Sequence, residues 1–262
     1  MKQRVKHSMA FVLAMLLLVS SMLPAAMAAP KTSGSCGKNL KWSFSAGTLT
    51  ISGKGTMYFP EEDIPWDELE IKKVVVKEGV TSLADYAFGW CEELSSVSLP
   101  KSLKSIGLYV FNGTKLKGVK VAKGSKYFST KDGVLFNKKK TVLYYYPTKK
   151  KGSSYTVPSS VKTIAEGAFA GSEGLAGYNP YLHKLVLPKK LKKVEQRAFA
   201  WSGITQYKFQ AGNPTIEDWA FDGASATILY PKNHKKCWTA ALKAIMKRYS
   251  EEEKPDLKLK AY

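Results

Sequence analysis

The chain has 262 residues, and its 41 Lys and Arg against 21 Asp and Glu give a formal net charge of +20. Hydrophobic residues make up 44% of the chain, enough to fill the core of one domain or one repeat array. The charge favours anionic partners, unless the lysines only solvate a long surface. Three cysteines, an odd and small number, exclude the dense disulfide framework of a small secreted domain.

The first 28 residues predict an export signal. A basic start is followed by an apolar run, Met9–Val19, and by the small-x-small site Ala26-Met27-Ala28. This order is typical of a secretory signal peptide, so we expect the mature chain to begin near Ala29. An uncleaved N-terminal anchor is the alternative. No later segment is apolar for long enough to cross a bilayer, so we expect no membrane span in the mature chain.

Residues 29–70 are predicted to form an N-terminal cap. Within them, Leu40, Trp42 and Phe44 alternate with polar residues, a turn follows, and Leu49 and Ile51 alternate again. A period of two on both sides of a short turn indicates a β-hairpin.

One apolar pattern then recurs along residues 71–231: Ile, Leu or Val, three residues, Ala or Val, and Phe. The five matches are Leu83/Ala87/Phe88, Ile106/Val110/Phe111, Ile164/Ala168/Phe169, Val194/Ala198/Phe199 and Ile216/Ala220/Phe221. Phe111 follows Phe88 by 23 residues, and Phe221 follows Phe199 by 22. A period of this length with apolar alternation is typical of a leucine-rich-repeat solenoid, with one parallel β-strand and a short helical or 3₁₀ return in each coil. We place strands at 72–76, 96–99, 118–121, 154–157, 184–187, 206–209 and 227–230.

Two longer gaps between Phe residues indicate insertions, near 122–153 and 174–181. The first holds two strand-like runs joined by Asn137-Lys138-Lys139-Lys140, so we expect a β-hairpin that projects from the stack. In residues 232–262, apolar residues from Trp238 to Tyr249 recur at helical spacing. They predict a capping helix, followed by a polar, mobile tail after Lys254.

The repeats resemble those of BspA-like bacterial surface proteins. The resemblance is carried by Glu78–Leu83, Ala87–Cys91, Val97–Pro100, the N-terminal stretch Cys36–Gly53 and the inserted stretch from Lys131 to Pro147. It implies a right-handed solenoid, exported to the cell surface or the medium, with binding or adhesive roles.

No motif predicts catalysis, a metal or a cofactor. The mature chain has two histidines, His183 and His234, and neither lies in a nucleophile or metal motif. We expect Cys91 to be a buried small hydrophobic residue and not a nucleophile. Cys36 and Cys237 belong to opposite caps, about 29 Å apart at ~4.8 Å per strand, so Cys36–Cys91 is the one conceivable disulfide. We expect all three thiols to be free.

Two groups of residues are candidates for binding. The first consists of lysines: Lys138, Lys139, Lys140, Lys149, Lys150, Lys151, Lys189, Lys190, Lys192 and Lys193. The two triplets belong to the inserted hairpin, so we expect them to lie together. The second consists of aromatics, namely Trp90, Trp201 and Tyr145. Trp90 and Trp201 both follow a repeat Phe by two residues, so they could share one edge. Ordinary packing between coils is the alternative for the aromatics.

These features predict a secreted or cell-surface-associated interaction module and not an enzyme. Its expected partner is an extracellular protein, the matrix, or an anionic glycan or cell-wall polymer, and nucleic acid is not expected. The alternative is a carbohydrate- or cell-wall-binding module that uses exposed tryptophans and lysines.

Overall fold

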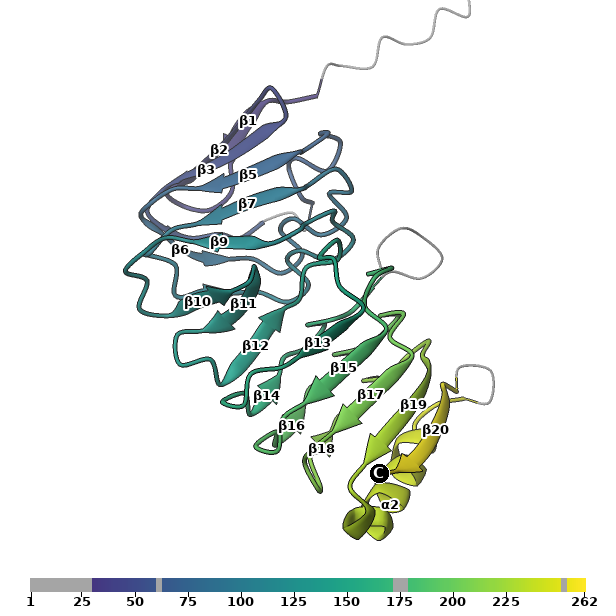
Figure 1. The fold of residues 1–262 in the computed structure, drawn as a ribbon. Helices are drawn as coiled ribbons and strands as arrows, with labels where there is room; N and C mark the ends of the chain where they lie inside the picture. Colours follow the sequence, from purple (N-terminus) through teal and green to yellow (C-terminus); the bar gives the residue numbers. More distant parts are fainter. Residues whose placement is uncertain (1–29, 60–62, 172–178, 251–253) are drawn as a thin grey trace, which may run out of the picture. The chain divides into compact units, whose positions relative to one another are not determined.

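The computed structural model describes residues 30–59, 63–171, 179–250 and 254–262. Residues 32–262 form a compact unit, and the description below concerns that unit. Short β-strands follow one another along the chain, and a helix lies near its C-terminal end (Figure 1). The signal peptide predicted for residues 1–28 lies outside the described residues, as does most of the insertion predicted at 174–181.

The N-terminal sheet joins a hairpin to a parallel ladder. β1 (Ser33–Ser35), β2 (Leu40–Ser45) and β3 (Thr48–Gly53) pair antiparallel. The ladder then continues in parallel through β5 (Lys73–Val76), β7 (Ser96–Leu99) and β9 (Val119–Val121). One buried column of side chains runs through the ladder in register: Leu49, Val74, Val97 and Val119.

A second parallel sheet occupies the C-terminal half. It consists of β13 (Ser154–Thr156), β15 (Lys184–Leu187), β17 (Gln206–Phe209), β19 (Ser225–Tyr230) and β20 (Asp256–Ala261). The seven strands predicted from the repeat agree with the observed strands to within two residues at each end. In β15, β17 and β19 buried and less buried residues alternate, because successive side chains of a strand point to opposite faces.

The mobile tail predicted after Lys254 is wrong for residues 256–261. They form β20, which pairs with β19 along all six of its residues. The segment reads Asp-Leu-Lys-Leu-Lys-Ala, and its apolar residues are the less exposed ones. Without this partner, β19 would present an unpaired edge. The segment was predicted to be a tail because it is highly charged, although its charged and apolar residues alternate with a period of two, which suits an edge strand.

A second set of short strands runs on another side of each repeat. β4 (Gly55–Thr56), β6 (Val80–Leu83) and β8 (Ser105–Ile106) form one small sheet. Further along, β12 (Val142–Tyr145), β14 (Thr163–Ile164), β16 (Lys193–Val194) and β18 (Thr215–Ile216) pair in parallel.

The insertion at 122–153 does not project from the stack as predicted. β10 (Phe128–Lys131) and β11 (Val134–Asn137) pair antiparallel, and β11 pairs with β12. Because β12 also pairs with β14, the hairpin extends the sheet of the repeats. Val134, Leu135 and Phe136 are fully buried. Burying this apolar side is favourable, and a projecting hairpin would leave it in water.

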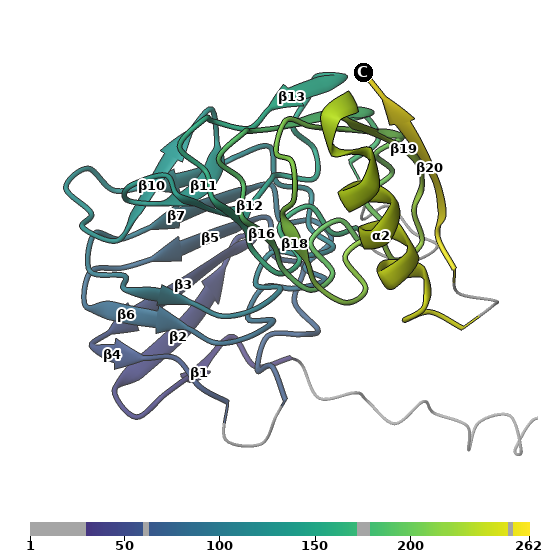
Figure 2. The same ribbon diagram turned by 90° about the horizontal axis from the view of Figure 1, so that it is seen from below.

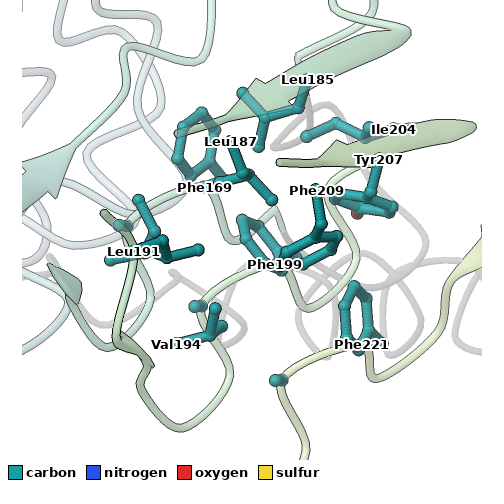
Figure 3. Close-up of a cluster of buried hydrophobic side chains, with 14 of the residues drawn as sticks. Phe169, Leu185, Leu187, Leu191, Val194, Phe199, Ile204, Tyr207, Phe209 and Phe221 are labelled. Carbon is teal, nitrogen blue, oxygen red and sulfur yellow. The ribbon is translucent and has the colours of Figure 1, made fainter. Parts of the chain in front are cut away.

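The repeat phenylalanines form the centre of the core. Phe88, Phe111, Phe169, Phe199 and Phe221 are all buried. The rings of neighbouring repeats lie close, with centroids 5.7 Å apart for Phe169–Phe199 and 5.3 Å apart for Phe199–Phe221. Figure 3 shows these rings among Leu185, Leu187 and other strand residues. Each buried Phe contributes roughly 1.5–3 kcal/mol by transfer from water.

A single α-helix among the described residues lies near the C-terminal end. α2 (Lys235–Met246) follows a short 3₁₀ turn, η1 (Lys232–His234), and lies beside β19 and β20 (Figure 2). Its buried residues are Trp238 and Ile245. The Trp238 ring lies 4.6 Å from that of Phe209 and 6.2 Å from that of Tyr230, measured between centroids. The helix therefore covers core residues of β17 and β19.

Candidate functional site

The segment around each repeat Phe forms turns with an unusual backbone and, within the described residues, not the short helical or 3₁₀ return that the sequence predicted. We call these segments the return turns; they are residues 84–91, 107–114, 165–171, 195–202 and 217–224. The second residue before Phe has positive φ in every repeat: Tyr86, Tyr109, Gly167, Arg197 and Trp219. The second residue after Phe has it in four: Trp90, Gly113, Trp201 and Gly223. Bulky residues rarely adopt this left-handed conformation.

Backbone hydrogen bonds between neighbouring return turns hold this conformation. Tyr86 N–H donates to Leu108 O at 2.8 Å, Phe88 N–H to Val110 O at 3.1 Å, and Trp90 N–H to Asn112 O at 2.7 Å. The same three bonds recur from Arg197, Phe199 and Trp201 to the next repeat. With the left-handed residues in place, every second N–H group of the return turn points toward the neighbouring repeat and donates to a carbonyl there.

Three aromatic side chains of the first two return turns stack on one another. The Tyr86 ring lies 5.6 Å from that of Trp90 and 5.3 Å from that of Tyr109, with interplanar angles of 19° and 10°. Trp90 is 55% exposed, and Tyr86 and Leu108 are also exposed. We call Trp90, Tyr86, Tyr109 and Leu108 the aromatic patch. Of these four residues, the sequence identified Trp90 alone. Tyr86 and Tyr109 are both the second residue before a repeat Phe, and this shared position could have indicated them.

The other two aromatic candidates have different surroundings. Tyr145 is buried, and its hydroxyl lies 3.2 Å from Thr114 Oγ1 and 3.3 Å from Phe111 O. Its ring packs against Phe111, which is the packing between coils that the sequence left open as the alternative for the aromatics. Trp201 is half-buried and lies over Gly223, where a β-carbon would meet its ring at 2.3 Å. Trp201 is four repeats from Trp90, or about 19 Å at ~4.8 Å per repeat, so the two rings form no common platform.

The structure separates the two lysine triplets that we expected to lie together. Lys138–Lys140 forms the turn between β11 and β12, whereas Lys150 Nζ donates to Asp132 O in the turn between β10 and β11. These turns lie at opposite ends of β11. Four residues of extended strand span about 10 Å, so the triplets belong to different faces.

Lys138–Lys140 instead joins lysines from neighbouring repeats. Lys138 N–H donates to Tyr127 O at 2.6 Å, and Lys140 O accepts the Ser160 hydroxyl at 2.8 Å. Lys192 N–H donates to Lys162 O at 2.8 Å, which places the next two repeats alongside. Each of these residues lies at the corner that leads into the second set of strands. We call the set the basic corner: Lys101, Lys104, Lys126, Lys138, Lys139, Lys140, Lys162, Lys189, Lys190 and Lys192.

One end of the basic corner is hollowed into a groove of about 600 Å³. Lys54, Lys101, Lys104 and Lys126 line it, with Tyr127, Ser102 and Thr81 between them. The groove has no carboxylate among its lining residues in the described part of the chain. Sequence reasoning missed it, although Lys101 and Lys104 repeat the spacing of Lys189 and Lys192.

Lys193 differs from its neighbours in the predicted cluster. Its Nζ lies 2.8 Å from Glu217 Oε1 and 3.4 Å from Glu195 Oε1. The hydrogen bond to Glu217 is the main cause that raises the Lys193 pKa. This ammonium is already paired within the protein, and it points to the return turns.

The cysteines and the acidic residues of the described chain are candidates for chemistry, and their burial and their neighbours bear on that role. Cys36, Cys91 and Cys237 are free. Burial raises the pKa of the Cys36 thiol to about 12 and, with a smaller effect of Asp67, that of Cys91 to about 12. Such thiols are protonated at neutral pH. Cys91 is half-buried, less enclosed than expected. Within the described ranges, no three His, Cys, Asp or Glu side chains gather as metal ligands, and no helix there is long and apolar enough to cross a membrane.

Comparison with solved structures finds similar chains at low identity. A leucine-rich repeat protein from Eubacterium ventriosum is 19% identical, covering 76% of this chain and 78% of its own, with a TM-score of 0.30. The pneumococcal vaccine antigen PcpA is 17% identical, covering 86% and 98%, with a TM-score of 0.40. A leucine-rich cell surface protein from Faecalibacterium prausnitzii is 13% identical, covering 78% and 90%, with a TM-score of 0.36. No match is found among curated proteins.

The repeat itself is the more specific likeness. Residues 66–173 and 143–241 match the BspA type leucine-rich repeat region, with six copies. Together the two matches span more than half of the chain and include all five return turns. The resemblance stated from the sequence is confirmed, and the chain belongs to the BspA-type leucine-rich-repeat family.

Proposed function

We propose that the protein is an exported interaction module that binds an anionic polymer along the basic corner. In this proposal residues 1–28 direct export, residues 29–70 and 232–262 cap the two ends, and the repeats between them form a closed solenoid. The family supports a role in surface interactions. An acidic glycan or cell-wall polymer is the ligand class that the charge favours.

The observation that carries this proposal is the alignment of lysines from successive repeats. From Lys126 beside β10 to Lys192 beside β16 there are four strand spacings, or about 19 Å at ~4.8 Å each. Nine of the ten lysines in the basic corner are exposed. A row of like charges this long suits a ligand with many anionic groups better than one small anion.

Enzymatic function and neutral-glycan binding have less support. Burial raises the pKa of the Cys36 and Cys91 thiols, and in the described part of the chain no three His, Cys, Asp or Glu side chains gather as metal ligands. Trp90 and Trp201 are widely separated and Tyr145 is buried, so the three aromatics that the sequence singled out do not form one platform for sugar rings.

The test compares two quadruple variants with the same change of charge. Lys104→Gln, Lys126→Gln, Lys138→Gln and Lys162→Gln remove charge from the basic corner. Lys73→Gln, Lys120→Gln, Lys151→Gln and Lys184→Gln remove exposed lysines elsewhere. Heparin is the probe, and binding is followed from 0.05 to 0.5 M salt.

We expect the corner variant to bind roughly 30-fold more weakly at low salt, since each exposed ion pair contributes about 0.5 kcal/mol. The control should lose less than threefold. The difference should shrink as salt rises, because exposed charges are screened over about 8 Å at physiological ionic strength. Equal losses in both variants would refute a site at the basic corner, and retention on neutral glycan beads instead would support the carbohydrate alternative.

A further inference from the structure

A pocket separates the return turns 107–114 and 165–171, at the place where the inserted repeat lies between them. In the five regular repeats, Phe comes five residues after the apolar residue of the second strand, as in Ile164 and Phe169. In the inserted repeat, Leu143 pairs with Ile164, and Tyr146 takes the place of Phe three residues later. Tyr146 N–H donates to Ala168 O, as Phe169 N–H does to Ala198 O. The inserted turn is two residues short.

The short turn leaves its two neighbours facing each other across a gap. Tyr109 reaches over it, and its hydroxyl donates to Glu166 Oε1 at 2.8 Å. The pocket beneath has a volume of about 100 Å³. Since a water molecule takes about 30 Å³ in the liquid, there is room for a single side-chain head group.

Two carboxylates and three tyrosines are among the residues that line this pocket: Glu166, Glu195, Tyr109, Tyr144 and Tyr145. Burial is the main cause that raises the pKa of Tyr109, with Glu166 adding to it, and burial with Glu195 raises the pKa of Tyr144. Both phenols therefore stay neutral. Glu195 Oε2 accepts the Glu166 N–H at 3.2 Å, and each carboxylate has further lone pairs to offer.

The charge of the return turns is opposite to that of the rest of the chain. The five segments contain six acidic residues and no lysine; Arg197, beside Tyr109, is their one basic residue. Two other cations lie against these acidic residues: Lys193 is paired to Glu195 and Glu217, and Arg248 is paired to Asp218. In a chain of net charge +20, this concentration of carboxylates beside stacked rings favours a cationic ligand over an anionic one.

The aromatic patch extends from this pocket along the first two return turns. Tyr109 belongs to both, and Tyr86 and Trp90 continue the stack. Trp90 has positive φ at a position that glycine occupies in three other repeats, Gly113, Gly171 and Gly223. Exposed aromatics beside a pocket are the residues that most often dominate binding to proteins.

We propose that this pocket and the aromatic patch bind a basic peptide segment of a partner protein. A lysine or arginine head group enters between Glu166 and Glu195, against the rings of Tyr109 and Tyr144. The peptide then lies over Tyr86 and Trp90. This site is distinct from the basic corner, and its existence does not depend on polyanion binding.

The experiment measures fluorescence anisotropy of two labelled ten-residue peptides, one of alternating Lys and Gly and one of alternating Arg and Gly. A matched peptide of alternating Glu and Gly is the ligand control. Glu166→Gln with Glu195→Gln should weaken binding of the basic peptides at least tenfold. Glu68→Gln with Asp132→Asn, which changes the same charge at exposed positions elsewhere, should weaken it less than twofold.

A third variant tests the aromatic patch without disturbing the fold. Trp90→Gly should weaken peptide binding threefold to tenfold while heparin binding and the melting temperature stay unchanged. Failure of the basic peptides to bind, or equal losses in the two charge variants, would overturn the proposal. Binding of a neutral glycan at this patch would also overturn it. The same holds for a dimer, detected by sedimentation, that the basic peptides do not dissociate.

Discussion

The basic corner and the return turns are two sides of the same repeats, and they are built in opposite ways. The corner carries lysines whose side chains extend into water. The repeats there are joined by backbone hydrogen bonds such as Lys192 N–H to Lys162 O and, at Lys101, by the Glu78 carboxylate, which accepts the Lys101 N–H at 3.0 Å. In the return turns, charged side chains support the backbone: Asp85 Oδ1 accepts the Leu108 N–H, and Glu217 Oε2 accepts the Gln196 N–H. One repeat can therefore separate charge by position, with solvated lysines gathered on one side and most of the hydrogen-bonded carboxylates on the other.

The largest effect should come from the core that both sides share. Phe169→Ala should lower the free energy of unfolding by about 3–5 kcal/mol, because it leaves a cavity between Tyr146 and Phe199. Denaturant unfolding would measure it, with exposed Tyr58→Ala as the control. A broader transition would also fit, since repeats couple mainly to their neighbours. An unchanged midpoint would show that the repeat register is wrong.

The next effect concerns the return turns alone. Gly223→Ala should cost roughly 2–5 kcal/mol, since Gly223 has φ of +60° and a β-carbon would lie 2.3 Å from the Trp201 ring. In a Trp201→Ala background the steric part should disappear, leaving only the left-handed cost of about 1–2 kcal/mol. A double-mutant cycle by thermal and denaturant melts measures the coupling. Strict additivity would contradict the contact.

A smaller effect separates the two sides directly. Asp85→Ala removes the acceptor of the Leu108 N–H, 2.7 Å away, and should cost about 0.5–1.5 kcal/mol. Lys162→Ala at the basic corner should cost nothing measurable, because its backbone makes the contacts with the neighbouring repeats. The denaturant midpoints of the two variants measure this difference. Equal losses of unfolding free energy would contradict the division between carboxylates that support the backbone and lysines that are solvated.

The effect that is smallest at neutral pH is chemical, and it appears only as the pH rises. The raised pKa of about 12 for Cys36 and Cys91 keeps both thiols protonated at pH 9, where an ordinary thiol of pKa ~8.5 is mostly thiolate. The linked stability is present below pH ~8.5 and is lost as the pH rises toward 12. Iodoacetamide at pH 9 should therefore label exposed Cys237 first, followed by mass spectrometry. Under denaturing, non-reducing conditions three thiols should react, and one would reveal a Cys36–Cys91 bond.

Several features of the fold could be predicted from local pattern alone. The spacing of Phe88, Phe111, Phe169, Phe199 and Phe221 sets the register of the core, and all five are buried as expected. The strands follow from alternation, and the α2 helix follows from Trp238, Ile245 and Tyr249. Each of these patterns involves residues a few positions apart, so it can be recognised without knowing which other segment of the chain packs against it.

The candidate sites were harder to predict, because their members come from different repeats. Lys138 and Lys162 belong to one surface while Lys150 belongs to another, and only the path of β11 reveals it. Tyr145 reads as a surface aromatic in a lysine-rich segment, yet it packs under Phe111. The charge of residues 256–261 suggested a tail, until β19 supplied the edge that they cover.

The sequence by itself determined the family, the repeat register, the inward phenylalanines and the excess of positive charge. The tertiary structure alone decided which lysines share a corner, which aromatics stack, and that a turn two residues short opens a pocket beside Glu166. The reason is physical. Each repeat must bury its own apolar residues, so the spacing of these residues is visible within a short stretch of sequence. A charged residue on the surface does not need to be buried, so its spacing follows no such rule. Its neighbours are fixed only when successive repeats pair in register.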